Sequence, residues 1–310
     1  MNSRSRVLFA GLILTAVGGI SPLVAQGMSS AVLFNKKEGP VQARSEVIFL
    51  DRNGLGLVVT EASVDFRSGR YLGEPVKLVA HDPVSWLTLI RVPLPEGEQT
   101  KPVELGNSLA LMPGDSLYLG VEGDTSLSRL VGRESEYKEQ SLPLELFRIH
   151  HQDEKNPALG HPMFDSAGRL VAINYRKATE FGNGSFAYPV EVVKRIQDAT
   201  FIDGVVQRSW FGVELLASDP FAVVQGVRQA SPAAKAGIVK GDILLQIEER
   251  PIRSYSDAIN AFFYLKEGEE EVVKFLRGTD VLEVTVTPEL VPAAAPVAPE
   301  SEVPESESGT

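Results

Sequence analysis

The chain has 310 residues, 43% of them hydrophobic, and its 41 acidic and 30 basic side chains give a formal net charge of −11. This length suffices for one large domain or two ordinary domains with hydrophobic cores, whereas the acidic balance argues against a general nucleic-acid-binding protein, which needs clustered Lys and Arg. The sequence contains no Cys, which excludes disulfides and thiolate metal sites and fits an oxidising compartment.

The N-terminus has the features of an export signal. Arg4 and Arg6 precede an uncharged stretch that runs from Val7 to Asn35, and small residues follow its most apolar part, "VLFAGLILTAVGGI". This order predicts a secretory signal peptide over residues 1–27. The alternative is an uncleaved membrane anchor, because the apolar run is nearly long enough to span a bilayer. Either reading exports the protein, to the periplasm or the extracellular space.

From Val47 to about Pro189 the pattern is that of short β-strands. The segments "EVIFL" and "LGLVVT" flank the turn sequence "DRNG", a β-hairpin signal. Further β-rich runs follow, each bounded by Gly, Pro, Asp or Asn: "VKLVA", "WLTLIRV", "SLYLGV", "LFRIH" and "RLVAIN". Many short strands between turns indicate a sandwich or a barrel. The segment "PVEVVKRIQDA" then changes to helical spacing and is predicted to close this unit.

A second unit begins near Trp210 and mixes strands with two helices. The predicted strands are "FGVEL", "AVVQGV", "DILLQI", "EVVKFL" and "VLEVTVT". One helix has Ser231 as its N-cap and Gly237 beyond its end, and the other begins after Ser254 and ends before Gly268. The last stretch, residues 289–310, consists mostly of Pro, Ala, Glu and Ser and is predicted to be disordered, because it offers little apolar surface to bury.

The motifs between Val47 and Thr287 resemble, in order and spacing, the HtrA-type (Deg) secreted serine proteases. The matching segments are "NGLGLVVTEASV", "AHDPVSWLTLIRV", "LGNSLALMPGDSLYLGV", "RIHHQDEKNPALGHPMFDSAGRLVAIN" and "SFAYPVEVVKRI". The resemblance implies a mainly β chain, in which a trypsin-like double β-barrel over residues 28–204 is followed by an α+β PDZ domain over residues 205–288.

The same resemblance implies that the catalytic triad is degenerate. Ser63 stands where the family has the catalytic His, Trp86 where it has the orienting carboxylate, and Leu159 in the nucleophile loop, which is one residue shorter and contains no Ser. A triad needs a base to take the hydroxyl proton and a carboxylate to orient that base. The oxyanion hole is affected as well, because Ala158 replaces a Gly or, with the gap placed earlier, Pro157 brings no N–H to a donor position.

A relocated catalytic or metal site is the alternative. Ser166 lies in a predicted turn, and His150, His151 and His161 are the histidines near it. Adjacent His residues on a strand point to opposite faces and make a poor bidentate site. A metal site formed by these residues with Asp153 or Asp165 is the alternative to an ordinary polar surface, and the sequence favours the polar surface. We therefore expect no metal and no cofactor.

The segment "RSWFGV" resembles the carboxylate-binding loop of HtrA-type PDZ domains. In such a loop, backbone N–H groups bind the terminal carboxylate of a peptide, and the strand that follows pairs with the peptide backbone. The predicted peptide-binding residues on this side are Arg208, Trp210, Phe211, Gly212, Val213, Glu214 and Leu215. For Arg208 the alternative is a solvated side chain that adds no binding energy.

The helix after Ser254 carries two apolar stripes. Ala258, Ala261, Phe262 and Leu265 form the stripe that seats the helix on its own core. Tyr255, Ile259 and Phe263 form a second stripe, from which Ile259 and Phe263 are predicted to line the peptide groove. The alternative is that the helix is wedged between its own sheet and the neighbouring barrel.

These residues support three hypotheses about function. The first is an exported scaffold without proteolytic activity whose PDZ domain binds peptide or protein C-termini or exposed strands. The second is a regulatory subunit that joins an active protease of the same family, in a homo- or hetero-trimer implied by resemblance. The third is a serine endopeptidase with a relocated site, which requires a Ser hydroxyl within hydrogen-bond reach of His150, His151 or His161.

Overall fold

The structure is a computed structural model that describes residues 31–39, 42–61, 63–119, 126–137, 140–152, 157–178 and 182–292. The predicted signal peptide, residues 1–27, lies outside these ranges, as do residues 293–310 of the predicted tail. Within the described ranges, no helix is both long and apolar enough to cross a membrane.

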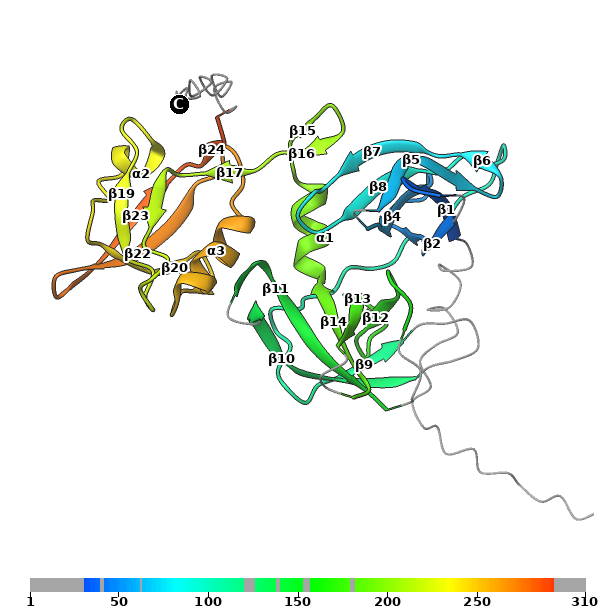
Figure 1. Cartoon of the computed structure of the whole chain (residues 1–310), viewed down its shortest axis with the longest axis horizontal. Coiled ribbons are helices and arrows are strands. Elements are labelled where there is room, and N and C mark those ends of the chain that lie inside the picture. Colours follow the sequence, from blue (N-terminus) through cyan, green and yellow to red (C-terminus); the bar gives the residue numbers. More distant parts are fainter. Residues whose placement is uncertain are drawn as a thin grey trace, which may run out of the picture.

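Two packed sheets form the first barrel (Figure 1). Their cores meet in one cluster that includes Val32 and Phe34 from one sheet and Val58 and Ile90 from the other. The first sheet has the order β2 (Gln42–Glu46), β1 (Ala31–Lys36), β5 (Val64–Tyr71), β6 (Glu74–Pro75). The second has the order β15 (Phe201–Ile202), β16 (Val205–Val206), β7 (Lys77–His81), β8 (Leu87–Arg91), β4 (Leu55–Val59), β3 (Ile48–Phe49).

The predicted hairpin at "DRNG" joins β3 to β4. Asp51 Oδ1 accepts hydrogen bonds from the backbone N–H groups of Asn53 and Leu55, both at 2.8 Å. An Asp side chain that binds the backbone two residues later is the usual device of such turns. The turn therefore sets the pairing of Ile48 with Leu57 and of Phe49 with Gly56.

The second barrel is closed. Its strand order is β10 (Leu127–Tyr137), β11 (Gln140–His151), β14 (Gly184–Pro189), β13 (Leu170–Ala178), β12 (Pro162–Phe164), β9 (Ser116–Leu119), and β9 pairs back with β10. Helix α1 (Val190–Gln197) leaves this barrel directly after β14.

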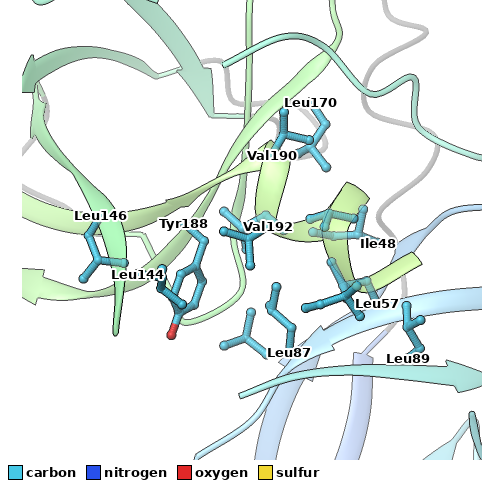
Figure 2. Close-up of a cluster of buried hydrophobic side chains, with 14 of the residues drawn as sticks. Ile48, Leu57, Leu87, Leu89, Leu144, Leu146, Leu170, Tyr188, Val190 and Val192 are labelled. Atoms are coloured by element: carbon cyan, nitrogen blue, oxygen red, sulfur yellow. The ribbon is translucent and has the colours of Figure 1, made fainter. Parts of the chain in front are cut away.

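A single hydrophobic core joins the two barrels (Figure 2). Figure 2 shows Leu144 and Tyr188 of the second barrel and Leu57 and Leu87 of the first, with Val192 of α1 between them. All five side chains are at most 3% exposed. This shared core confirms the predicted trypsin-like double barrel closed by a helix.

The C-terminal unit is a small α+β domain with its own core. Its sheets are β17 (Ser209–Trp210) with β24 (Glu289–Leu290), β18 (Val213–Leu215) with β19 (Val224–Val227), and β21 (Arg250–Pro251), β20 (Ile243–Ile247), β22 (Glu271–Arg277), β23 (Asp280–Val286) in that order. The core includes Phe211, Leu244 and Phe275. Two helices cover it, α2 (Pro232–Lys235) and α3 (Tyr255–Phe263).

Both helices begin at the predicted N-caps. The Ser231 side chain accepts a hydrogen bond from the N–H of Ala234, and the Ser254 side chain accepts one from the N–H of Asp257, at 3.3 and 3.1 Å. These bonds satisfy backbone donors that have no partner inside the helix. Gly237, at φ +81°, follows α2 as predicted.

Two predicted domain boundaries differ from the structure. Val205, assigned by sequence to the PDZ domain, pairs with His81 in the first barrel. Glu289 and Leu290, assigned to the disordered tail, form β24 and pair with Trp210 and Ser209. The reason is the same in both cases, because each segment is too short to show a strand pattern and is ordered by backbone pairing with a distant strand.

Helix α3 also packs on the second barrel, as Figure 1 shows beside β11. Ser256 Oγ donates to Glu136 Oε1 at 2.7 Å, and Asn260 Nδ2 donates to the carbonyl of Leu142 at 3.4 Å. Phe263 is 5% exposed and belongs to the core that joins the barrels. The helix is thus held by its own domain on one face and by the barrel on another.

Candidate functional site

Ser63 and Trp86 are the residues that the sequence analysis predicts at the triad positions of the His and the carboxylate. Ser63 is exposed in the turn before β5, and its hydroxyl donates to Glu61 Oε2 at 3.4 Å. Trp86 has a left-handed backbone, φ +59°, and its carbonyl accepts hydrogen bonds from the N–H and the hydroxyl of Thr60. Neither side chain takes up a proton near neutral pH, so no base is present at these two positions.

Residues 157–161, predicted to replace the nucleophile loop, are held by hydrogen bonds within the segment and to Asn174. Gly160, at φ +80°, donates its N–H to the carbonyl of Asn174, and His161 donates its N–H to the carbonyl of Ala158. The Asn174 amide in turn donates to the carbonyls of Pro157 and Ala158 at 2.8 and 2.9 Å. Two amides of this loop are therefore engaged by protein carbonyls rather than directed at a substrate. Asn156 and Asp153 lie outside the described residues.

A small cavity of about 200 Å³ remains beside this loop, lined among others by Leu159, Ser45 and Thr60. His161 lies close to Glu46, with Nδ1 and Oε2 3.2 Å apart. The nearby Ser45 hydroxyl accepts from the N–H of Val59 and donates to the carbonyl of Glu46. A His–carboxylate pair is present here, but within the described ranges no hydroxyl is hydrogen-bonded to His161, so the pair has no nucleophile to activate.

His151 meets the distance criterion of the relocated-site hypothesis. Its two ring nitrogens lie 2.8 Å from Ser128 Oγ and 2.8 Å from Ser185 Oγ. All three residues are at most 1% exposed, inside the second barrel. A peptide bond cannot reach a hydroxyl buried in this way, and the two hydrogen bonds satisfy a polar core residue instead.

This buried imidazole predicts a pH dependence of stability. Burial in the barrel lowers the pKa of His151 to about 4, with smaller contributions from His150 and His161. Because the unfolded chain then binds more protons than the folded one between about pH 6.5 and 4, the free energy of unfolding should fall as the pH falls through this window. Urea unfolding of the wild type and of His151→Gln over this range would measure it. Parallel profiles for the two proteins would contradict the assignment.

Ser166 and His150, two other polar residues named in the sequence analysis, both lie at the surface. Ser166 is exposed in the turn between β12 and β13, where Asp165 Oδ1 accepts a hydrogen bond from the N–H of Ala167. His150 is also exposed. Among the residues that the structure describes, no group of three or more His, Cys, Asp or Glu side chains is arranged to hold a metal ion.

The loop between β17 and β18 presents backbone donors. The carbonyls of Phe211 and Gly212 accept hydrogen bonds from the N–H groups of Ala233 and Arg228, both at 2.8 Å. Gly212 has φ +84°, which turns the chain sharply between the two strands. Within the described part of the chain, the N–H groups of Phe211 and Gly212 have no acceptor. Adjacent unpaired amides of this kind form a concave anion-binding site.

Strand β18 continues from this loop with one edge open. In the described ranges it pairs with β19 alone, through Val213, Glu214 and Leu215. Glu214 is exposed, whereas Val213 and Leu215 are half-buried against the core of the domain. An edge strand beside an anion-binding loop has the geometry needed to pair with the C-terminal residues of an extended peptide.

Phe262 of helix α3 packs against the core of the PDZ domain, as the sequence predicts, and also contacts Phe211 of the loop. The rings of Phe262 and Phe211 meet edge to face, with centroids 5.2 Å apart, and Phe262 is half-buried. Tyr255 and Ile259 are half-buried too and share this side of the helix by their spacing of four and three residues. Phe262 thus contacts the side chain of Phe211, one of the two residues whose N–H group is open.

The prediction that Phe263 lines the groove is wrong. Its side chain belongs to the core that joins the barrels, which also includes Leu144 and Leu146, and its ring contacts Tyr264 edge to face. Consecutive helical residues are about 100° apart around the axis, so Phe262 and Phe263 face different neighbours. On this face α3 is wedged against the neighbouring barrel, which is the alternative given above for the second apolar stripe.

The prediction that Arg208 binds peptide is also wrong. Its guanidinium forms an ion pair with Asp82 of the first barrel, which is 0% exposed. It also lies over the Phe263 ring, 4.3 Å from the centroid. Asp82 accepts three further hydrogen bonds, from the N–H of Val84 and from the N–H and the hydroxyl of Ser85. Arg208 is therefore a link between the two domains. Trp210, by contrast, flanks the loop, with the Arg228 guanidinium over its ring.

Comparison with known proteins agrees with a double barrel followed by a PDZ domain. Residues 209–287 match the family model of the PDZ domain. A protein of Pseudomonas putida (strain GB-1), named "Probable periplasmic serine endoprotease DegP-like", is 30% identical over 220 residues, which cover 65% of this chain and 45% of that relative. A protein of the same name from Chlamydia trachomatis is 27% identical over 237 residues, covering 70% of this chain and 47% of the relative. The chain spans about half the length of the curated relatives it matches.

Solved structures show the same architecture. The HtrA-type protease AlgW with a tripeptide matches with a TM-score of 0.58 and 21% identity, over 88% of this chain and 97% of that chain. AlgW with a decapeptide matches with a TM-score of 0.55 and 21% identity, over 87% and 97%. At this identity the likeness shows the fold, two barrels followed by a PDZ domain.

Proposed function

We propose that this chain, an HtrA-type protein in its fold and in its PDZ domain, is an exported peptide-binding protein without proteolytic activity. The observation that carries the proposal is the pair of unsatisfied N–H groups at Phe211 and Gly212 beside the open edge of β18. The terminal carboxylate of a peptide would accept hydrogen bonds from both amides, and its backbone would pair with Val213 to Leu215.

Apolar side chains should set the preference of the groove. Phe211, Phe262 and Ile259 surround the place where the last side chain of such a peptide would lie. The ligand that fits is therefore a C-terminus with an apolar last residue, the kind of end that an extended or partly unfolded protein presents. Export of this chain is supported by the predicted signal segment and by relatives that are named periplasmic.

The barrels then serve as a scaffold rather than as an enzyme. Ser63 and Trp86 supply neither a general base nor a carboxylate to orient one, and Leu159 supplies no nucleophile. The engaged amides of Gly160 and His161 further support the absence of an oxyanion hole. In a mechanism that needs all of these parts together, the loss of each removes most of the rate enhancement.

Proteolysis should not return when the triad side chains alone are restored. The variant that combines Ser63→His, Trp86→Asp and Leu159→Ser is expected to leave unfolded casein uncut, because its loop stays one residue short and held by Asn174. Release of labelled peptides from casein measures this, with an active HtrA-type protease as the positive control. Turnover by the wild-type chain that a serine-directed inhibitor stops would refute the proposed loss of activity.

Peptide binding should depend on a free terminal carboxylate. In a fluorescence-anisotropy titration of the full chain, a peptide ending in Phe or Val is expected to bind at least about tenfold more tightly than its C-terminally amidated form, since two charge-assisted hydrogen bonds are lost. Equal binding of the two forms would show that the loop does not hold the carboxylate.

A further inference from the structure

The position of the open amides determines the direction in which a peptide would lie on β18. The N–H groups of Phe211 and Gly212 come directly before the strand, at its N-terminal end. A peptide whose terminal carboxylate binds there must run antiparallel to β18. Its last residue then lies beside Val213, the penultimate residue beside Glu214, and the third from last beside Leu215.

Alternate residues of β18 face opposite sides of the strand. Val213 and Leu215 are half-buried and pack against the core of the PDZ domain, whereas Glu214 between them is exposed on the other face. Residues directly opposite each other in an antiparallel pair carry their side chains on the same face. The last side chain of the peptide therefore faces the apolar side of the domain, and the penultimate side chain lies next to the carboxylate of Glu214.

The carboxylate of Glu214 is accessible and unpaired. Its neighbour on β19 is Gly226, and a Cβ at Gly226 would lie 3.2 Å from Glu214 Oε2. On that side, therefore, no side chain covers or neutralises the carboxylate. Among the described residues, the Glu214 side chain has no ion pair and accepts no hydrogen bond. An exposed side chain of this kind can turn toward a cation on an added strand.

Given the proposed peptide binding, on which this inference rests, we infer that the groove prefers a Lys or Arg as the penultimate residue of its ligand, through Glu214. Opposite charges directly across an antiparallel pair stabilise the pairing, and like charges there destabilise it. A penultimate Asp or Glu is therefore disfavoured. The ligand class is a free C-terminus in which a basic residue is followed by an apolar one.

Peptides that differ only at the penultimate residue test this preference. They end in Lys-Val, Ala-Val or Glu-Val, each with a free carboxylate. In anisotropy titrations of the full chain at low ionic strength, the Lys-Val peptide is expected to bind about two- to fivefold more tightly than the Ala-Val peptide, and the Glu-Val peptide is expected to bind most weakly. These differences should shrink at high salt, which screens exposed charges.

A positional control separates contact with Glu214 from general attraction to an acidic protein. This peptide has the composition of the Lys-Val peptide, but its Lys is moved to the N-terminal end and Ala stands before Val. Since its net charge is unchanged, it should bind more weakly than the Lys-Val peptide only if the penultimate position is recognised. Equal binding of these two peptides would overturn the inference.

The outcomes distinguish this preference from peptide binding itself. Equal binding of the Lys-Val and Glu-Val peptides, with both weakened by C-terminal amidation, would overturn the preference and leave the proposed function standing. If no peptide with a free carboxylate binds, the proposed function fails and the preference with it. Tighter binding of the Glu-Val peptide would point to Arg228, whose guanidinium lies over the Trp210 ring, and would overturn the role of Glu214.

Variants of Glu214 test its own role. Glu214→Gln should remove the difference between the Lys-Val and Glu-Val peptides, and Glu214→Lys should reverse their order. Asp280→Asn removes the same charge from an exposed position on β23, a strand that does not pair with β18, and should keep the wild-type order. Because both positions are exposed, all three variants should unfold at the urea concentration of the wild type. A preference for Lys-Val that persisted in Glu214→Gln would overturn the assignment.

Discussion

Replacing Phe263 with Ala is expected to lower the free energy of unfolding by about 3–5 kcal/mol, the usual cost of truncating a buried Phe in a well-packed core. The side chain is 5% exposed and fills the contact between α3 and the barrels, beneath the Arg208 guanidinium. Affinity for a C-terminal peptide should change little, because Phe263 faces away from the loop at Gly212. Urea unfolding and peptide titration of the same preparation measure the two effects.

Phe262→Ala is the matched control, one position earlier on the same helix. Phe262 is half-buried against Phe211 at the groove, so its loss should weaken peptide binding by about 1–3 kcal/mol and cost less stability than the loss of Phe263. If Phe263→Ala instead abolished peptide binding and left stability unchanged, the assignment of Phe263 to the barrel side of α3 and of Phe262 to the peptide side would be contradicted.

Gly212→Ala is expected to abolish measurable peptide binding. A Cβ at Gly212 would lie 2.3 Å from Ser231 Cβ and 2.6 Å from Ser231 Oγ, closer than such atoms approach. The loop must therefore move, and with it the two amides that would hold the carboxylate. The positive φ of +84° adds a backbone cost of about 1–2 kcal/mol. Titration with a labelled C-terminal peptide measures the loss.

Gly237→Ala is the control that separates the effect of the steric clash with Ser231 from the effect of a positive φ. Gly237 has nearly the same conformation, φ +81°, but a Cβ there would have no atom within 4 Å. This variant should lose stability through the backbone alone and bind peptide as the wild type does. Loss of binding in Gly237→Ala would mean that general destabilisation, rather than displacement of the loop, abolishes binding in Gly212→Ala.

The sequence predicts those features of the fold that depend on local chemistry. The Asp51 turn, the Ser231 and Ser254 caps and the short strands between Gly and Pro each follow from a few neighbouring residues, and the structure confirms them. Gly212 is among the peptide-binding residues that the sequence predicts. The structure adds a reason why this position needs Gly, the close approach of Ser231, which comes from the packing of α2 on the loop.

Features that depend on how the domains meet were not predictable in this way. Phe262 and Phe263 are both apolar and both fit a helical stripe, and only the position of the barrel decides which one is buried beside it. Arg208 looks like a carboxylate ligand next to the loop until Asp82, more than a hundred residues earlier, is placed beside it. Such contacts leave no periodic pattern in either partner segment.

The docking of α3 on β11 affects the PDZ domain when it is produced without the barrels. A PDZ domain excised after Val206 would expose the apolar ring of Phe263 to water and leave Arg208 without its carboxylate. Ser256 and Asn260 would lose their barrel acceptors at the same time. An isolated PDZ domain would therefore expose an apolar surface that promotes aggregation. Fusing this domain to another protein calls for polar replacements on that surface, while Phe211, Gly212 and Phe262 are kept unchanged.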